Sequence, residues 1–200
     1  MTPQHGFLSI RPLNSNIVAD DSTIKEIVKE EMRRLGNDAD LNHINTSKVT
    51  SFESLFDTLD FCGDVSEWDV HNVRVFSNMF FACRKFDCDL SKWETESATN
   101  MTWMFGYCEN FQGAGVEKFI VDKVFDFSQM FINCKRLTCK VDSWNPIKMK
   151  YADEMFKGCE LFDCDLSRWN CELLEKGENM FLKTKIENNK KKWPKAVLML

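Results

Sequence analysis

A repeat of about 25 residues, marked by an apolar dipeptide that ends in phenylalanine, constrains the fold more than any other feature of the sequence. The six copies are Leu55-Phe56, Met79-Phe80, Met104-Phe105, Met130-Phe131, Met155-Phe156 and Met180-Phe181. Their successive spacings are 24, 25, 26, 25 and 25 residues. A unit this short cannot bury its own apolar side chains, so the copies must stack and share one core.

Each unit divides into two halves with different hydrophobic periods. In the second copy Val73, Phe76, Phe80 and Cys83 fall on one face of a helical segment. The stretch Phe86–Leu90 alternates apolar and polar residues, as a half-buried strand does, and the fifth copy repeats this alternation. The sequence therefore predicts an α/β repeat, with short parallel strands on one side of the stack and helical turns on the other.

The two ends of the array differ from its repeats. The segment Thr23–Leu35 predicts an amphipathic helix that begins with a capping box of Thr23 and Glu26 and stops at Gly36. In the sixth copy Glu187 stands where a core phenylalanine is expected. We therefore predict four parts: an N-terminal extension over 1–20, a cap helix and lead-in over 21–48, five to six repeat units over 49–182, and a basic cap with an apolar tail over 183–200.

Three segments carry a resemblance to a known family. They are MFFACRKFDCDLSKWE, MFKGCELFDCDLSRWN and the lead-in RRLGNDADLNHINTSKVTSFESLF. Over about residues 30–182 the chain resembles the BspA-type, leucine-rich-repeat-like surface protein repeat, which occurs in bacterial surface proteins and in protist and large-virus genomes. The resemblance implies a right-handed leucine-rich-repeat-like solenoid with adhesion or interaction roles and no enzymatic activity.

The nine cysteines are interpreted as reduced thiols, because their number is odd and the N-terminus lacks the pattern of an export signal. Cys134, Cys139, Cys159 and Cys164 have the spacing C-x4-C-x19-C-x4-C, which is similar to that of a four-cysteine zinc site. The equivalent positions of other copies hold glycine, leucine or threonine. This variation favours small core residues over metal ligands or an oxidised, disulfide-stapled ladder.

Two pairs of aspartates bracket cysteines of the repeat, Asp87 with Asp89 and Asp163 with Asp165. Alternation along a strand predicts that both members of a pair project from the same face. Such a face could bind calcium or a basic partner, although a solvated acidic surface is the simpler interpretation. These four residues are our predicted interaction face.

The C-terminal segment is basic, whereas the rest of the chain is acidic. Residues 183–195 hold six lysines and one glutamate, a charge of +5, so the remainder carries −10 of the total −5. Lys190, Lys191, Lys192 and Lys195 could contact nucleic acid or an anionic surface, but the acidic body disfavours nucleic acid as the main partner. We therefore expect a solvated end or a protein contact, with the apolar residues 196–200 packed on the last turn or into a partner.

Other residue types yield no catalytic pattern. His5, His43 and His71 lie in unrelated positions without a nucleophile motif and are expected at the surface. The recurring tryptophans could form an exposed stacking stripe, but their regular place beside apolar residues favours the core. These are Trp68, Trp93, Trp144 and Trp169. No glycine-rich phosphate loop is present.

Together these patterns predict a non-enzymatic protein-interaction or structural module without a cofactor. No apolar stretch approaches the roughly 20 residues of a membrane-spanning helix, and we expect an intracellular or virion-associated protein. Its expected partner is another protein, within a larger assembly such as a virion or a surface scaffold. The alternative is a thiol-redox or metal-responsive protein that uses the stacked cysteine columns.

Overall fold

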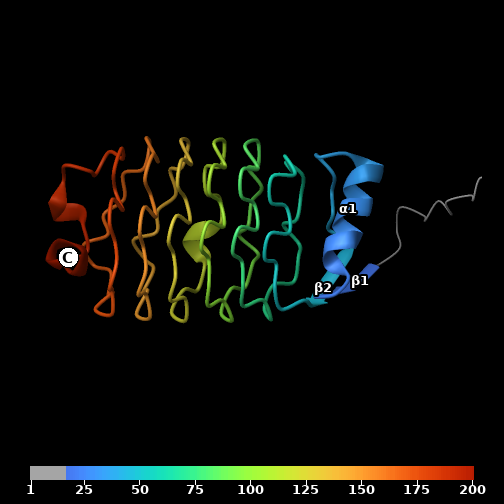
Figure 1. Cartoon of the computed structure of the whole chain (residues 1–200), viewed down its shortest axis with the longest axis horizontal. Coiled ribbons are helices and arrows are strands. Elements are labelled where there is room, and N and C mark those ends of the chain that lie inside the picture. The colour runs from blue at the N-terminus through green and yellow to red at the C-terminus, as the bar shows by residue number, and fades with distance from the viewer. Residues whose placement is uncertain (1–16) are drawn as a thin grey trace, which may run out of the picture.

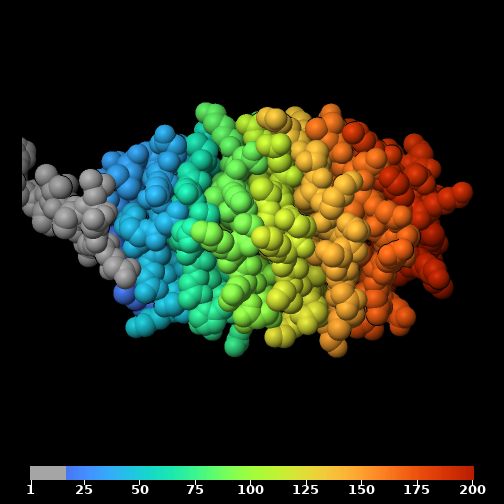
Figure 2. Space-filling model, turned by 180° about the vertical axis from the view of Figure 1, so that it is seen from behind, coloured from blue at the N-terminus to red at the C-terminus, as the bar shows by residue number. Residues whose placement is uncertain are grey.

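The computed structural model describes residues 17–200. The chain runs through successive coils along the long axis of the molecule, with helix α1 at one end and the C-terminus at the other (Figure 1). We number the coils one to six by the six phenylalanine dipeptides. In the space-filling view the coils form adjacent bands along an elongated body (Figure 2). Each coil therefore packs chiefly against the coils before and after it.

The N-terminal cap consists of two strands and one helix. Strand β1 (Ile17–Asp20) pairs in parallel with strand β2 (Ile44–Lys48), and helix α1 (Ile24–Leu35) connects them. The predicted helix and its stop at Gly36, which has a φ of 96°, are confirmed. The predicted start of the cap at residue 21 is wrong, because β1 lies before it.

The predicted capping box at the start of α1 is also wrong. No side chain at Thr23 caps the helix. The Thr23 hydroxyl instead bonds Asp20, donating to its carboxylate at 2.8 Å and accepting from its amide at 3.0 Å. The residues before the helix are thus held by a local turn around Asp20.

Apart from α1, the described chain has only short 3-10 helices. These are η1 (Val116–Lys118), η2 (Lys190–Lys192) and η3 (Lys195–Met199). None of the helices within residues 17–200 has the length and apolar character needed to span a membrane. Residues 73–83 of coil two and the equivalent residues of the other coils form no helix, so the helical halves that we predicted from the spacing in the second copy are wrong.

Two successive β-turns replace the predicted helix in each coil. In coil two the Met79 amide donates to the Phe76 carbonyl at 3.1 Å, and the Cys83 amide donates to the Phe80 carbonyl at 2.9 Å. Asn78, the third residue of the first turn, has a φ of 56°, and the third residue of the second turn has a φ of 58°. Positive φ at this position is typical of type II turns and interrupts a helix. Consecutive four-residue turns place their first and fourth residues inward, which produces the same apolar spacing as a helix.

Backbone hydrogen bonds join these turns from one coil to the next. From coil two to coil three, four alternate amides donate to carbonyls at 2.8 to 3.0 Å. The donors are Phe76, Asn78, Phe80 and Ala82. The same four bonds link every successive pair of coils from one to six. We call this array the turn ladder.

Parallel pairing between coils lies at the start of the turn ladder. Isolated parallel bridges connect Ser51, Val75, Asn100, Asp126, Tyr151 and Lys176 in succession. The predicted strand at Phe86–Leu90 is not formed, although its side chains alternate as predicted, with Phe86 and Leu90 buried. In this half of coil two the Leu90 amide donates to the Ala114 carbonyl of the next coil at 3.0 Å, but its amides form no ladder.

Stacked phenylalanines form the centre of the core. Phe131 is fully buried, with its ring centroid 5.6 Å from that of Phe105 and 5.5 Å from that of Phe156. The planes are inclined by only 6° and 11°. The same stacking continues from Phe56 through Phe181. One residue per coil thus builds an aromatic column through the whole stack.

The recurring tryptophans belong to the core, as predicted. Trp68, Trp93, Trp144 and Trp169 are at most 5% exposed. Each indole N–H donates to a backbone carbonyl of the preceding turn of chain, at 2.8 to 3.1 Å. A buried tryptophan needs such a partner for its indole N–H. These hydrogen bonds connect successive coils, and the tryptophans do not form an exposed surface for ligand stacking.

The C-terminal cap replaces the missing aromatic residue of the sixth repeat. Ile186 is fully buried beside Glu187, and Trp193 packs on Phe181 with a centroid distance of 4.9 Å. The first two residues of the apolar tail pack against the core, which confirms part of the prediction for this segment. The last three, Leu198–Leu200, remain exposed.

Candidate functional site

The first cysteine column lies inside the core and binds backbone oxygen. Its members are Cys83, Cys108, Cys134 and Cys159. The Cys134 thiol donates to the Phe105 carbonyl of the preceding coil at 3.0 Å, and that carbonyl also accepts the Cys108 amide at 2.9 Å. The other three thiols make the equivalent bond. The thiol therefore gives a buried carbonyl a second donor, which is a structural role.

Burial suppresses ionisation of these thiols. It raises the pKa of Cys83 to about 12, and it raises the pKa values of Cys108, Cys134 and Cys159 well above their usual value. The thiolate is the form that ligates metal and attacks electrophiles. The first column thus stays protonated near neutral pH.

The thiols of the second cysteine column, Cys139 and Cys164, are also held in their protonated form. Burial raises the pKa of Cys139 to about 12 and also raises the pKa of Cys164. Within residues 17–200 no group of three or more His, Cys, Asp or Glu side chains is placed to hold a metal ion. Cys134 and Cys159 therefore do not join Cys139 and Cys164 in a four-ligand site.

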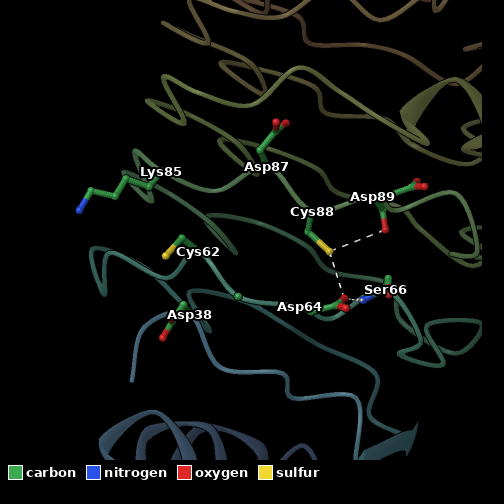
Figure 3. Close-up of a pocket in the computed structure, with 9 residues that line it drawn as sticks. Asp38, Cys62, Asp64, Ser66, Lys85, Asp87, Cys88 and Asp89 are labelled. Atoms are coloured by element: carbon green, nitrogen blue, oxygen red, sulfur yellow. Dashed lines mark hydrogen bonds between the residues drawn. The ribbon is translucent and has the colours of Figure 1, made fainter. Parts of the chain in front are cut away.

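An acidic cleft of about 370 Å³ lies at the N-terminal end of the stack (Figure 3). Its lining comes from the lead-in and the first two coils: Asp38, Cys62, Gly63, Asp64, Ser66, Lys85, Asp87, Cys88 and Asp89. The figure shows Cys88 pointing toward Asp64, while Lys85 extends away from the other side chains. Four carboxylates against one ammonium group make this cleft attractive to cations.

Asp64 lines the cleft and accepts hydrogen bonds from residues around it. Burial opposes its ionisation, but hydrogen bonds from Ser66, Asn42 and Cys88 outweigh burial and lower the pKa of Asp64. The Ser66 amide lies 2.8 Å from its carboxylate, and the Cys88 thiol lies 3.4 Å away. Burial raises the pKa of Cys88 to about 12. The pair therefore consists of a neutral thiol and an ionised acid, an arrangement without an activated nucleophile.

In the predicted interaction face, the second aspartate of each pair stabilises a turn. Asp89 accepts the Ser91 amide at 2.8 Å, and Asp165 accepts the Ser167 amide at 3.0 Å. The hydroxyl and amide of Ser167 lower the pKa of Asp165. These Asx-turns recur with the D-x-S pattern of the repeat. Charge reversal there would disturb the turn as well as the surface.

The first aspartate of each pair contacts a neighbouring segment of the chain. Asp87 accepts two hydrogen bonds from Gln112 of the next coil, at 2.9 Å from the amide and 2.7 Å from the side chain. Asp163 pairs with Lys192, which lowers the pKa of Asp163, and its carbonyl accepts a bond from Lys140 at 2.8 Å. The four aspartates are exposed, as predicted, and each also makes a structural contact.

The lysine cluster of the tail is divided between structure and solvent. Lys192 bonds Asp163, and the Lys190 ammonium group lies 5.9 Å from the Trp193 ring centroid. Lys191 and Lys195 are exposed. This arrangement supports the solvated end that we favoured from the charge balance.

The three histidines have different surroundings. His5 lies outside the described residues. His43 is half-buried and bonds the buried Glu31 at 3.1 Å, so the surface prediction is wrong for His43. His71 lies at the surface, as predicted, with 44% of its side chain exposed, and its bond to Asp69 at 2.5 Å raises the pKa of His71.

Sequence reasoning missed a cluster of outward aromatic side chains. Phe81, Trp103 and Tyr107 lie on the outer side of the turn ladder, with ring centroids 5.3 to 6.3 Å apart. The available signal was a change of residue type, since the positions equivalent to Trp103 are polar in the other five coils.

Comparison with known proteins finds one family. A model described as "Mycoplasma protein of unknown function, DUF285" matches residues 23–115 and again residues 99–193. The two overlapping matches run from the cap helix to the C-terminal cap and agree with a tandem repeat. No curated protein and no solved structure matches the chain.

Proposed function

The chain belongs to this DUF285 family, and we propose that it works as a non-enzymatic protein-interaction or structural module with a leucine-rich-repeat-like solenoid fold. The observation that carries the proposal is the contrast between its inward and outward columns. Inward positions repeat the same apolar residues, whereas the third position of the first turn holds Ser54, Asn78, Trp103, Gln129, Glu154 and Asn179. A stack whose core does not depend on these residues can vary its surface to suit a partner.

The chemistry of the side chains supports an interaction role over a reaction. The buried thiols have raised pKa values, which disfavours the thiol-redox and metal-responsive alternative. The aspartates Asp89 and Asp165 are engaged in turns. The acidic cleft can attract a cation but contains no activated nucleophile.

We further propose that the module is related to BspA-type repeats and belongs to a larger assembly, such as a virion or a surface scaffold. The exposed apolar residues Leu198–Leu200 at the end of the stack support this proposal, with Met199 86% exposed. Apolar side chains gathered at one end are favourably covered by a neighbouring protein.

Affinity capture from the organism that produces the protein tests the proposal. The folded chain is used as bait under reducing conditions, bound proteins are identified by mass spectrometry, and metal is measured in the same sample. We expect a stoichiometric protein partner that is lost with the core variant Phe131→Ala. Recovery of a lone, metal-loaded chain would contradict the proposal and favour the metal-responsive alternative.

A further inference from the structure

The outward aromatic cluster has a defined geometry. The Phe81 ring is inclined by 77° to Trp103 and by 80° to Tyr107, at centroid distances of 5.3 and 5.7 Å. The rings of Trp103 and Tyr107 are nearly parallel, at 9° and 6.3 Å. All three side chains are half-buried. Two parallel rings and one perpendicular ring thus form a compact surface feature.

Gly106 lies beneath the cluster, between Trp103 and Tyr107 in sequence. A Cβ atom at this position would meet Trp103 Cε3 at 2.9 Å, Phe81 Cδ2 at 3.2 Å and Ile132 Cγ2 at 3.3 Å. The side chains of Trp103 and Phe81 therefore pack directly against the backbone at Gly106. Equivalent positions in the neighbouring coils hold Phe81 and Ile132, so this glycine makes room for the rings.

The backbone at both ends of the cluster is strained. Trp103 and Tyr107 have φ values of 60° and 62°, in a region that bulky residues rarely adopt and that asparagine tolerates better. Asn78 and Asn133 occupy an equivalent position to each in neighbouring coils, with φ of 56° and 58°. Positive φ recurs at these two turn positions in every coil, whereas aromatic residues occupy them only in coil three, so the turns do not require the aromatic side chains.

The polar tips of the cluster are available to a partner. The other five tryptophans donate their indole N–H to a backbone carbonyl. Within residues 17–200, neither the Trp103 indole N–H nor the Tyr107 hydroxyl makes a hydrogen bond in the structure. Tryptophan and tyrosine with free polar tips are the residue types enriched at binding hot spots.

On the coil-one side, the surface next to Phe81 is acidic. Asp57 is the coil-one equivalent of Phe81, and the ladder bond from the Thr58 amide to the Phe81 carbonyl, at 2.9 Å, sets them side by side. The Oδ1 atom of Asp57 is buried and has no hydrogen-bond partner in the described chain. Glu53 and Asp60 are exposed on the same coil, whose residues 51–60 include no lysine or arginine.

From this juxtaposition we propose that Phe81, Trp103 and Tyr107 dock an arginine or lysine side chain from a basic segment of a protein partner. A cation over the faces of tryptophan and tyrosine is attracted by their ring electrons, and Asp57 supplies the complementary charge. The proposal rests on the interaction function above and specifies its site and the chemistry of the partner.

The test uses a hexa-arginine peptide as the probe and its hexa-citrulline counterpart as the neutral control. Binding to the whole chain is followed by the NMR shift of the Trp103 indole N–H. We expect saturable binding of the arginine peptide that weakens at least tenfold in Trp103→Asn and Tyr107→Asn, and several-fold in Asp57→Asn. Gln129→Asn, at the position equivalent to Trp103 in the next coil, is the matched control and should bind as the wild type does.

Stability separates this site from a merely structural cluster. Because asparagine tolerates the left-handed conformation, Trp103→Asn should melt at or above the temperature of the wild type. A fall in melting temperature of many degrees would mean that the cluster serves the fold and would overturn the proposal. Equal binding of the arginine peptide to wild type and Trp103→Asn, or equally tight binding of the citrulline peptide or of a neutral oligosaccharide, would also overturn it. If capture still recovers a partner with Trp103→Asn as bait, the site is wrong while the interaction function stands.

Discussion

Truncation of Phe131 should be among the most destabilising single changes in the chain. The Phe131 side chain is completely buried, with 0% of its surface accessible to solvent. Its ring stacks between Phe105 and Phe156 in the adjacent coils. Phe131→Ala would therefore leave a cavity in the middle of the aromatic column.

The magnitude follows from these contacts. Truncation of a buried phenylalanine to alanine typically costs about 3–5 kcal/mol, and each stacked pair contributes about 0.5–1.5 kcal/mol beyond the buried area. With a stacked partner on both sides, we expect a loss of about 4–5 kcal/mol in the free energy of unfolding. Domains of this kind are stable by about 5–15 kcal/mol, so the variant would lose a large share of its stability.

Urea unfolding, followed by tryptophan fluorescence and circular dichroism, measures the loss. Phe125→Ala is the matched control, because it removes the same ring from a side chain that is 41% exposed. The control should lose no more than about 0.5 kcal/mol, as surface substitutions do. Equal losses at Phe131 and Phe125 would refute the assignment of the inward column.

Three further predictions follow from the site. Because burial raises thiol pKa values, the four cysteines of the first column should resist alkylation at pH 8 in the folded protein, whereas the half-buried Cys62 should react; rapid labelling of all nine without denaturant would contradict the buried column. Hydrogen bonds from Thr50 lower the pKa of Asp21, so its contribution to stability is present above the usual aspartate pKa of about 3.9 and is lost as the pH falls through the lowered value. Asp21→Asn should therefore flatten the loss of stability below about pH 4 in acid titrations, and an unchanged acid limb would show that the contact is unimportant. Asp165→Ala should cost about 0.5–1.5 kcal/mol, the net worth of a typical hydrogen bond, in thermal melts, against no change for Asp122→Ala, which removes an exposed aspartate.

The inward columns could be predicted from the sequence because their chemistry recurs. The phenylalanines, tryptophans and first cysteine column are buried as the spacing indicated. The backbone conformation could not be predicted in the same way. Two type II turns place apolar residues at the same intervals as a helix does. Glycine, the usual signal for positive φ, is present in the turns of the turn ladder only at Gly158.

The contacts of the outward residues depend on register between coils, which a single sequence does not reveal. Asp87 is exposed, as predicted, but its hydrogen bond from Gln112 of the next coil could not be predicted. The cluster of Phe81, Trp103 and Tyr107 joins residues from two coils, so it emerges only when the coils are stacked. Local patterns identified the scaffold, and stacking determines the surface.

A substitution scan of residues 127–134 would test most directly whether inward residues build the fold while outward residues are free for recognition. Folded yield after limited proteolysis would be the readout. We predict that most substitutions at Phe127, Met130 and Phe131 abolish the resistant fold, whereas Ser128 and Gln129 accept most polar residues. Comparable intolerance at the inward and outward positions would contradict the account.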